Sequence, residues 1–149
     1  MFSSVWQKFK ADLGAPTMSP AQRQQEAVAV LLHEVAHADL QENALELDQV
    51  MQELSQSFGL SREEAERLRN DAADTADRTV SLYKLVETLN QSLDVEGKRE
   101  LLARLWRVAL ADGVLDPHEE ALIRKLSELL FVPHAVFVQE RLRALGELP

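Results

Sequence analysis

Apolar side chains recur every three or four residues along most of this chain, which is the spacing of one face of an α-helix. No segment alternates polar and apolar residues in the way that a half-buried strand would. The helical stripes lie at Val28–Val35, Leu47–Phe58, around Leu68, at Leu82–Leu93, Leu101–Ala109, Leu122–Leu129 and after Pro133. The pattern therefore predicts an all-α protein of about seven helices.

Helix start and stop signals separate these stripes. Ser19-Pro20 is typical of an N-cap followed by proline in the first turn. Ser61-x-x-Glu64 is a capping box, and Gly59 stops the stripe before it. Asp94 and Asp116-Pro117 predict the starts of two later helices. Proline is absent from residue 21 to residue 116, so nothing breaks the helices between these signals.

One motif of the chain occurs twice, with the second copy 73 residues after the first. The first copy reads Leu32-x-x-Val35-Ala36-x-Ala38-Asp39-x-x-x-Asn43-x-x-Glu46. The second copy reads Leu105-x-x-Val108-Ala109-x-Ala111-Asp112-x-x-x-Asp116-x-x-Glu119, and Phe58 matches Phe131 at the same offset. An internal repeat of this kind indicates a repeated structural unit. We expect two helix-loop-helix repeats packed about a pseudo-twofold axis in a single domain.

The segment 1–18 precedes the repeats and differs from them. Its apolar residues share one helical face, with two lysines beside them: Phe2, Val5, Trp6, Phe9 and Leu13, with Lys8 and Lys10. Such a segment either packs on its own domain or contacts a membrane surface or a protein partner through residues 2–13. We therefore divide the chain into an N-terminal amphipathic segment, 1–18, and a helical domain, 19–149.

Composition excludes several classes of function. The chain has no cysteine, so thiolate metal sites and thiol catalysis are excluded. Its net charge is −9, and residues 39–96 hold 14 acidic against 5 basic residues. This surface repels phosphate, so we expect no nucleic-acid partner. No apolar run approaches the roughly 20 residues that span a bilayer, and no signal peptide is recognisable, so the expected location is cytoplasmic.

Three stretches of the chain resemble the TerB-like family, that is, the tellurite-resistance TerB domain, which is related to the N-terminal region of DjlA-type co-chaperones. They are Leu31–Asp39, Ser81–Asn90 and Leu105–Val132, within a similarity that covers roughly residues 21–143. The resemblance implies a compact all-helical domain of bacterial stress and metal-resistance systems, without an enzyme activity. It also implies that the paired acidic residues, here Asp39, Glu46, Asp112 and Glu119, bind a cation. Leu40 and Asn43 depart from the pattern, because the second repeat has Gly113 and Asp116 there.

The acidic motif has two interpretations that do not exclude each other. In one, Asn43 and Asp116 cap the second helix of each repeat, Glu46 and Glu119 complete capping boxes, and the preceding aspartates tether that helix across the loop. In the other, the loops converge and the carboxylates bind Ca²⁺, Mg²⁺ or Mn²⁺. Asp39, Glu46, Asp112, Asp116 and Glu119 are then the candidate ligands.

A second motif, His33-Glu34-Val35-Ala36-His37, matches the H-E-x-x-H pattern of zinc metalloproteases. The repeat argues against a zinc site here, because His33 aligns with Trp106 and His37 with Leu110, which look like packing positions. We therefore predict no catalytic residues and no zinc cofactor. A zinc-dependent hydrolase built on His33 and His37 stays as an alternative.

The sequence thus favours a non-enzymatic domain of TerB type that binds a divalent cation, a protein partner, or both through its acidic surface. A protein-interaction module that needs no metal is the third possibility. The sequence does not identify the metal or the partner.

Overall fold

The computed structural model describes residues 18–39, 43–77 and 81–147, and the amphipathic face predicted at residues 2–13 lies outside this part. The described residues form seven helices and no strand, as the apolar pattern predicts. In chain order they are α2 (Pro20–Ala36), α3 (Ala44–Phe58), α4 (Arg62–Asp77), α5 (Leu82–Ser92), α6 (Val95–Ala109), α7 (Pro117–Leu129) and α8 (His134–Ala144). No helix among the described residues is long and apolar enough to cross a bilayer.

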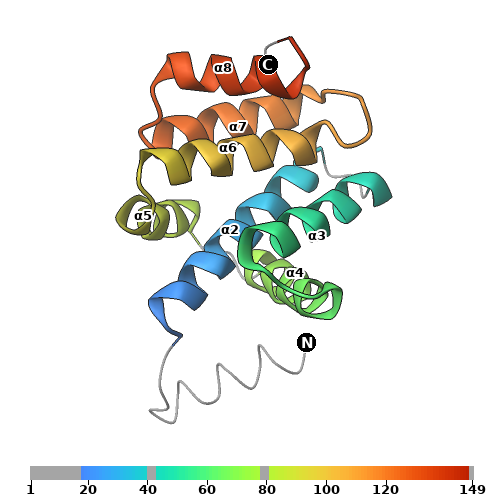
Figure 1. Ribbon diagram of the computed structural model, residues 1–149, viewed down its shortest axis with the longest axis vertical. Helices are drawn as coiled ribbons and strands as arrows, with labels where there is room; N and C mark the ends of the chain where they lie inside the picture. The colour runs from blue at the N-terminus through green and yellow to red at the C-terminus, as the bar shows by residue number, and fades with distance from the viewer. Residues whose placement is uncertain (1–17, 40–42, 78–80, 148–149) are drawn as a thin grey trace.

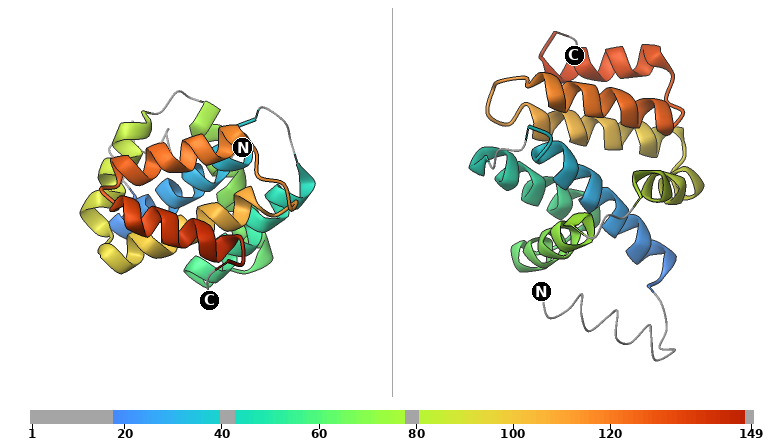
Figure 2. Two further views of the ribbon diagram at one scale, coloured as in Figure 1. Left: turned by 90° about the horizontal axis from the view of Figure 1, so that it is seen from above. Right: turned by 180° about the vertical axis from the view of Figure 1, so that it is seen from behind.

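Helix α2 runs through the centre of the molecule, with α3 and α4 on one side and α6, α7 and α8 stacked on the other (Figures 1 and 2). Its six consecutive residues from Ala27 to Leu32 are all buried. A helix that is apolar all round is buried on every side, which explains why α2 lies between the other helices. The apolar core closes around Trp106 of α6, whose ring lies 5.6 Å from that of Phe137 in α8.

Most helices begin at the residues that the sequence indicates. The Ser19 side chain accepts a hydrogen bond from the backbone N–H of Gln22, and Ser61 forms the predicted capping box with Glu64. Asp94 accepts from the backbone N–H of Gly97 at a distance of 2.7 Å. Helix α3 ends at Phe58, and the next residue, Gly59, adopts the left-handed conformation (φ 63°) that glycine tolerates best.

The first repeat of the sequence corresponds to α2 and α3, and the second to α6 and α7. A buried ion-pair network joins them, because Glu53 of α3 is 1 % exposed and contacts both Arg104 and Arg107 of α6. The guanidinium groups lower the pKa of Glu53 despite its burial, so this carboxylate stays charged. The network holds the two helix-loop-helix units together. The pseudo-twofold symmetry between them stays a prediction.

Candidate functional site

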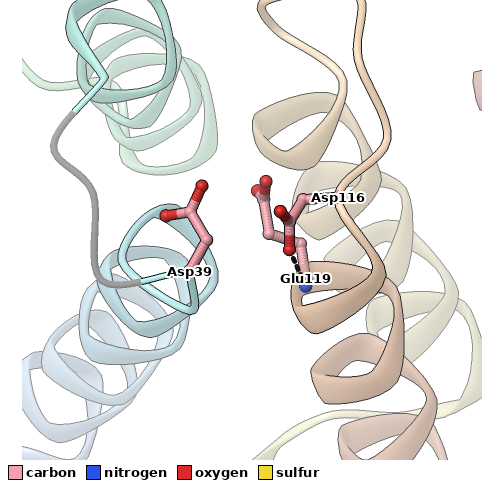
Figure 3. A group of neighbouring side chains, drawn as sticks. All are labelled: Asp39, Asp116 and Glu119. Atoms are coloured by element: carbon pink, nitrogen blue, oxygen red, sulfur yellow. Dashed lines mark hydrogen bonds between the residues drawn. The ribbon is translucent and has the colours of Figure 1, made fainter.

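The loops of the two repeats meet at one end of the helical stack. Asp39 follows the end of α2, and Asp116 and Glu119 lie at the start of α7. Figure 3 shows these three side chains turned toward one another. Each offers a carboxylate oxygen, and the three oxygens lie within 4.8 Å of one another. The two loops therefore converge, which is the arrangement that the cation interpretation requires.

These residues line an open hollow of about 510 Å³. Its wall is largely acidic and comes from both loops and from the starts of α3 and α7: Asp39, Asn43, Ala44, Asp112, Val114, Asp116 and Glu119. Asp39 and Asp112 follow the C-terminal ends of α2 and α6, where the helix dipole is already negative. The hollow therefore has a negative potential that attracts cations.

Asn43 and Asp116 are the N-caps of α3 and α7, as predicted. The Oδ1 atom of Asn43 accepts from the backbone N–H groups of Leu45 (2.9 Å) and Glu46 (3.3 Å). The Oδ1 atom of Asp116 accepts from those of His118 (2.7 Å) and Glu119 (3.4 Å). The two caps thus use one side-chain oxygen each and leave the other polar atom for a different contact.

The role expected for Asp112 as a tether of the next helix is wrong. Its Oδ1 accepts from the backbone N–H of Val114 at 3.0 Å, within its own loop. Its Oδ2 accepts from the side-chain amide of Asn43, which lies in the other repeat, at 2.7 Å. The loop is short enough for Asp112 to close a local turn, so the N-cap of α7 is left to Asp116 alone.

Glu46 and Glu119 do not complete capping boxes either. They are 2 % and 1 % exposed, and they hydrogen-bond to each other across the two repeats. Two carboxyl groups can share a hydrogen bond only if one is protonated. Burial, this hydrogen bond and the neighbouring carboxylates raise the pKa of Glu119 to about 9, and burial also raises the pKa of Glu46. The pair therefore holds one proton near neutral pH.

In each of the two glutamates the Oε2 atom is buried, and no N–H or hydroxyl group of the described residues donates to it. A buried acceptor without a partner costs roughly 1–3 kcal/mol, so such atoms are rare unless something binds them. The proton that the two carboxyl groups share is a donor available to these buried oxygens, and Glu119 also lines the hollow.

Of the five predicted ligands, the structure brings Asp39, Asp116 and Glu119 together as the group that one ion can bridge. Asp112 lines the same hollow, but the Asn43 amide and a backbone N–H occupy its oxygens. Glu46 lies behind Glu119 as its hydrogen-bond partner. The bond between Asn43 and Asp112 was not foreseen, although the repeat alignment already marks Asn43 as the position where the two copies differ.

His33 and His37 lie on one face of α2, and their rings stack with centroids 4.1 Å apart. The Nδ1 atom of His37 lies 2.9 Å from the carbonyl oxygen of His33. Burial and His37 lower the pKa of His33 to about 4, so the His33 imidazole is neutral near pH 7. Catalytic zinc needs three protein ligands, and among the described residues the histidines belong to no group of three. Both positions are partly buried, which agrees with a packing role.

Two comparisons with known proteins, one with family models and one with solved structures, each found a match. The family model described as tellurite resistance protein TerB matches residues 25–142. No curated protein matches significantly. A similar solved structure is the crystal structure of a protein of unknown function from Porphyromonas gingivalis W83, with a TM-score of 0.62 and 19 % identity over 88 % of this chain and 98 % of that one. At this identity the structure supports the fold alone, whereas the family model covers most of the chain. The chain therefore belongs to the TerB family of tellurite-resistance-type domains.

Proposed function

We propose that this protein is a non-enzymatic TerB domain that binds one divalent cation through Asp39, Asp116 and Glu119. The observation that supports the site best is the convergence of three carboxylate oxygens within 4.8 Å of one another. Two oxygens that both coordinate Ca²⁺ at 2.3–2.6 Å lie at most about 5 Å apart. The group thus fits the shell of one such ion with little movement.

The donor atoms determine the class of cation. All three ligands are carboxylates, which favour hard cations such as Ca²⁺, Mg²⁺ or Mn²⁺ over zinc. Mg²⁺ requires ligands at about 2.0–2.1 Å, so the group would have to contract more for Mg²⁺ than for Ca²⁺. Because the hollow is open, water can complete the coordination shell. We expect Ca²⁺ or Mn²⁺ to bind more tightly than Mg²⁺.

A bound cation would also change the protonation of the buried pair. Binding to Glu119 requires its carboxylate form, so the ion displaces the proton that Glu119 shares with Glu46. The positive charge then offsets the repulsion among Asp39, Asp116 and Glu119. The affinity should therefore increase as the pH rises, with up to one proton released per ion bound.

A thermal-denaturation titration tests this function on chelator-treated full-length protein without a histidine tag. CaCl₂, MnCl₂ and MgCl₂ are added separately, and ligand at a hundred times its dissociation constant should stabilise the native state by about 2.7 kcal/mol. Isothermal titration calorimetry should give one equivalent of Ca²⁺. A melting temperature that does not move at millimolar concentration of any of the three ions would refute the proposal.

The other candidate functions make different predictions. A zinc hydrolase would lose its activity on replacement of Glu34, and it would not depend on Asp116. A module that only captures a protein partner would do so equally well in the presence of a chelator. The acidic surface supports a basic partner in general, but no contact among the described residues singles one out.

A further inference from the structure

A second open hollow, of about 250 Å³, lies between the first half of α2 and the adjacent helix α4 (Figures 1 and 2). Three of the side chains that line this α2–α4 hollow are apolar: Met18, Leu60 and Leu68. Leu60 and Leu68 also pack against the core and stay partly exposed. An apolar side chain that entered the hollow would therefore extend the core and lose its contact with water.

The remaining side chains of the α2–α4 hollow are polar or charged: Gln22, Gln25, Glu26, Glu64, Arg67 and Asp71. Three carboxylates are thus present beside one guanidinium group, which gives the hollow a negative potential. Burial raises the pKa of Glu26, so a positive group beside it would stabilise its charged form. The hollow therefore suits a ligand that combines an apolar face with basic side chains.

The chain itself places such a segment at the edge of the hollow. Met18 lines the hollow, and residues 1–17, which directly precede it, lie outside the described part. Residues 14–17 join the segment 2–13 to Met18 and span at most about 14 Å when fully extended. So short a linker makes docking intramolecular, with an effective concentration on the order of millimolar. Pro16 interrupts a helix that would otherwise continue into α2, so the segment can reverse its direction there.

The segment 2–13 matches the α2–α4 hollow in pattern, charge and length. Its apolar residues share one helical face, and Lys8 and Lys10 lie beside that face. A helix over these residues would be about 18 Å long, and α4 runs for about 10 Å from Glu64 to Asp71, at 1.5 Å per residue. The hollow can thus contact about two turns of the segment, and the lysines are opposite in charge to its acidic side chains.

Another hollow, of about 210 Å³ between α2, α3 and α6, fits the segment less well. Its lining includes the apolar Val28, Phe58 and Leu101, and also Glu100 and Arg104. The two charged side chains pair with each other at 3.3 Å, so this hollow has no excess of negative charge. Met18 is not among the residues that line it. Charge and chain connection therefore both favour the α2–α4 hollow.

We propose that residues 2–13 of this chain fold back as an amphipathic helix onto the α2–α4 hollow. Their apolar face contacts Met18, Leu60 and Leu68, and their lysines face the carboxylates of α2 and α4. Docking hides the apolar face of the segment, so a membrane or a protein partner can bind it only after release. This inference does not depend on the proposed cation site.

Tryptophan fluorescence reports the position of the segment in the full-length protein. The chain has two tryptophans, Trp6 in the segment and Trp106, which is 0 % exposed in the core. Subtracting the signal of Trp6→Phe from that of the wild type isolates Trp6 while acrylamide is titrated. A docked segment that is free for about 10 % of the time gives Trp6 a quenching slope about tenfold below that of the protein unfolded in urea.

Charge variants test which surface holds the segment. Lys8→Glu/Lys10→Glu lies outside the helical domain and should raise the quenching slope of Trp6 at least about threefold, because a surface ion pair changes an equilibrium by up to about fivefold. Glu64→Gln should raise it less, and it keeps the capping box of α4 because glutamine also serves there. Glu63→Gln is the matched control, since Glu63 is exposed on the first turn of α4 and does not line the hollow. It should leave the slope unchanged.

A cross-linking pair locates the docked segment. Because the chain has no cysteine, Gln7→Cys/Arg67→Cys places one thiol in the segment and one at the hollow. The control is Gln7→Cys/Arg23→Cys, because Arg23 is exposed on α2, is closer to the segment along the chain and does not line the hollow. Each pair loses one positive charge of the folded domain. A short bismaleimide should link the pair at position 67 several times faster than the pair at position 23.

The remaining outcomes contradict the inference in different ways. A Trp6 slope equal to that of the unfolded protein means that the segment does not dock. Protection of Trp6 that grows with protein concentration, together with a dimer in size-exclusion chromatography, assigns the segment to a second copy. Protection only after vesicles of anionic phospholipid are added assigns it to a membrane. Cross-linking at position 23 that is as fast as at position 67 overturns the choice of the α2–α4 hollow.

Discussion

Replacing Glu119 by glutamine removes the carboxyl group that shares a proton with Glu46 and leaves the shape of the site nearly unchanged. Glutamine has nearly the same shape, and its amide can donate to Glu46 without binding a proton. In the metal-free protein the pair of Glu46 and Glu119 holds one proton near neutral pH, because the pKa of Glu119 is raised to about 9. In the unfolded chain Glu119 ionises near its ordinary value of 4.5. Between these two values the native state binds one more proton than the unfolded state.

The sign and size of the effect follow from this difference. Since the native state holds the extra proton, the free energy of unfolding falls as the pH rises, by up to about 1.4 kcal/mol per pH unit. From pH 6 to pH 8 the wild type should lose at most about 2.7 kcal/mol from this proton. Glu119→Gln should lose far less over the same range, and it should exceed the wild type in stability at pH 8 when no metal is present.

Urea denaturation at pH 6, 7 and 8, on chelator-treated protein and followed by circular dichroism, measures this directly. Glu128→Gln is the matched control, because Glu128 is an exposed glutamate on the same helix, α7. It should follow the wild type at every pH. Parallel curves of stability against pH for the wild type and Glu119→Gln would refute the shared proton. Saturating Ca²⁺ should stabilise the wild type at pH 8 and have little effect on Glu119→Gln.

Three further predictions concern other parts of the molecule. Phe131 is 79 % exposed and has a positive φ of 57°, which strains a residue with a side chain, so Phe131→Gly should raise the free energy of unfolding by about 0.5–1 kcal/mol in urea denaturation. A lower free energy of unfolding would show that contacts of the ring outweigh the backbone strain. Glu53→Ala leaves Arg104, whose side chain is 14 % exposed, without its buried partner, and should lower the free energy of unfolding by about 3 kcal/mol or more in the same assay. A decrease of less than about 1 kcal/mol would contradict the stabilising role of the ion-pair network. The protein should cleave no general protein substrate in the presence of zinc, and zinc-dependent cleavage abolished by Glu34→Gln would overturn the non-enzymatic proposal.

Local signals in the sequence predicted the helices and where several of them begin. The stripe at Leu82–Leu93 and the caps at Ser19, Ser61 and Asp94 act over one or two turns, and each predicted its helix correctly. Capping and helical spacing depend on neighbours three or four residues away, so they can be read without knowledge of the fold. The burial of α2 on all sides was also foreshadowed by its unbroken apolar run from Ala27 to Leu32.

The repeat indicated which acidic residues correspond to each other, but it did not indicate which of them contact one another. Asp112 and Asp39 occupy corresponding positions, and yet Asp112 bonds to Asn43 whereas Asp39 approaches Asp116 and Glu119. Glu46 and Glu119 look like capping-box residues in the sequence, and the packing turns them toward each other instead. Glu53 resembles any surface glutamate until two arginines of α6 enclose it.

The sequence by itself thus determined the all-α class, the helix boundaries and the family, because these depend on local spacing and on a motif that is written twice. Only the tertiary structure decided which carboxylates meet, which of them share a proton and which are satisfied by an amide. Those outcomes depend on distances between residues about 70 positions apart, and burial gives each such contact a free energy that no local pattern encodes.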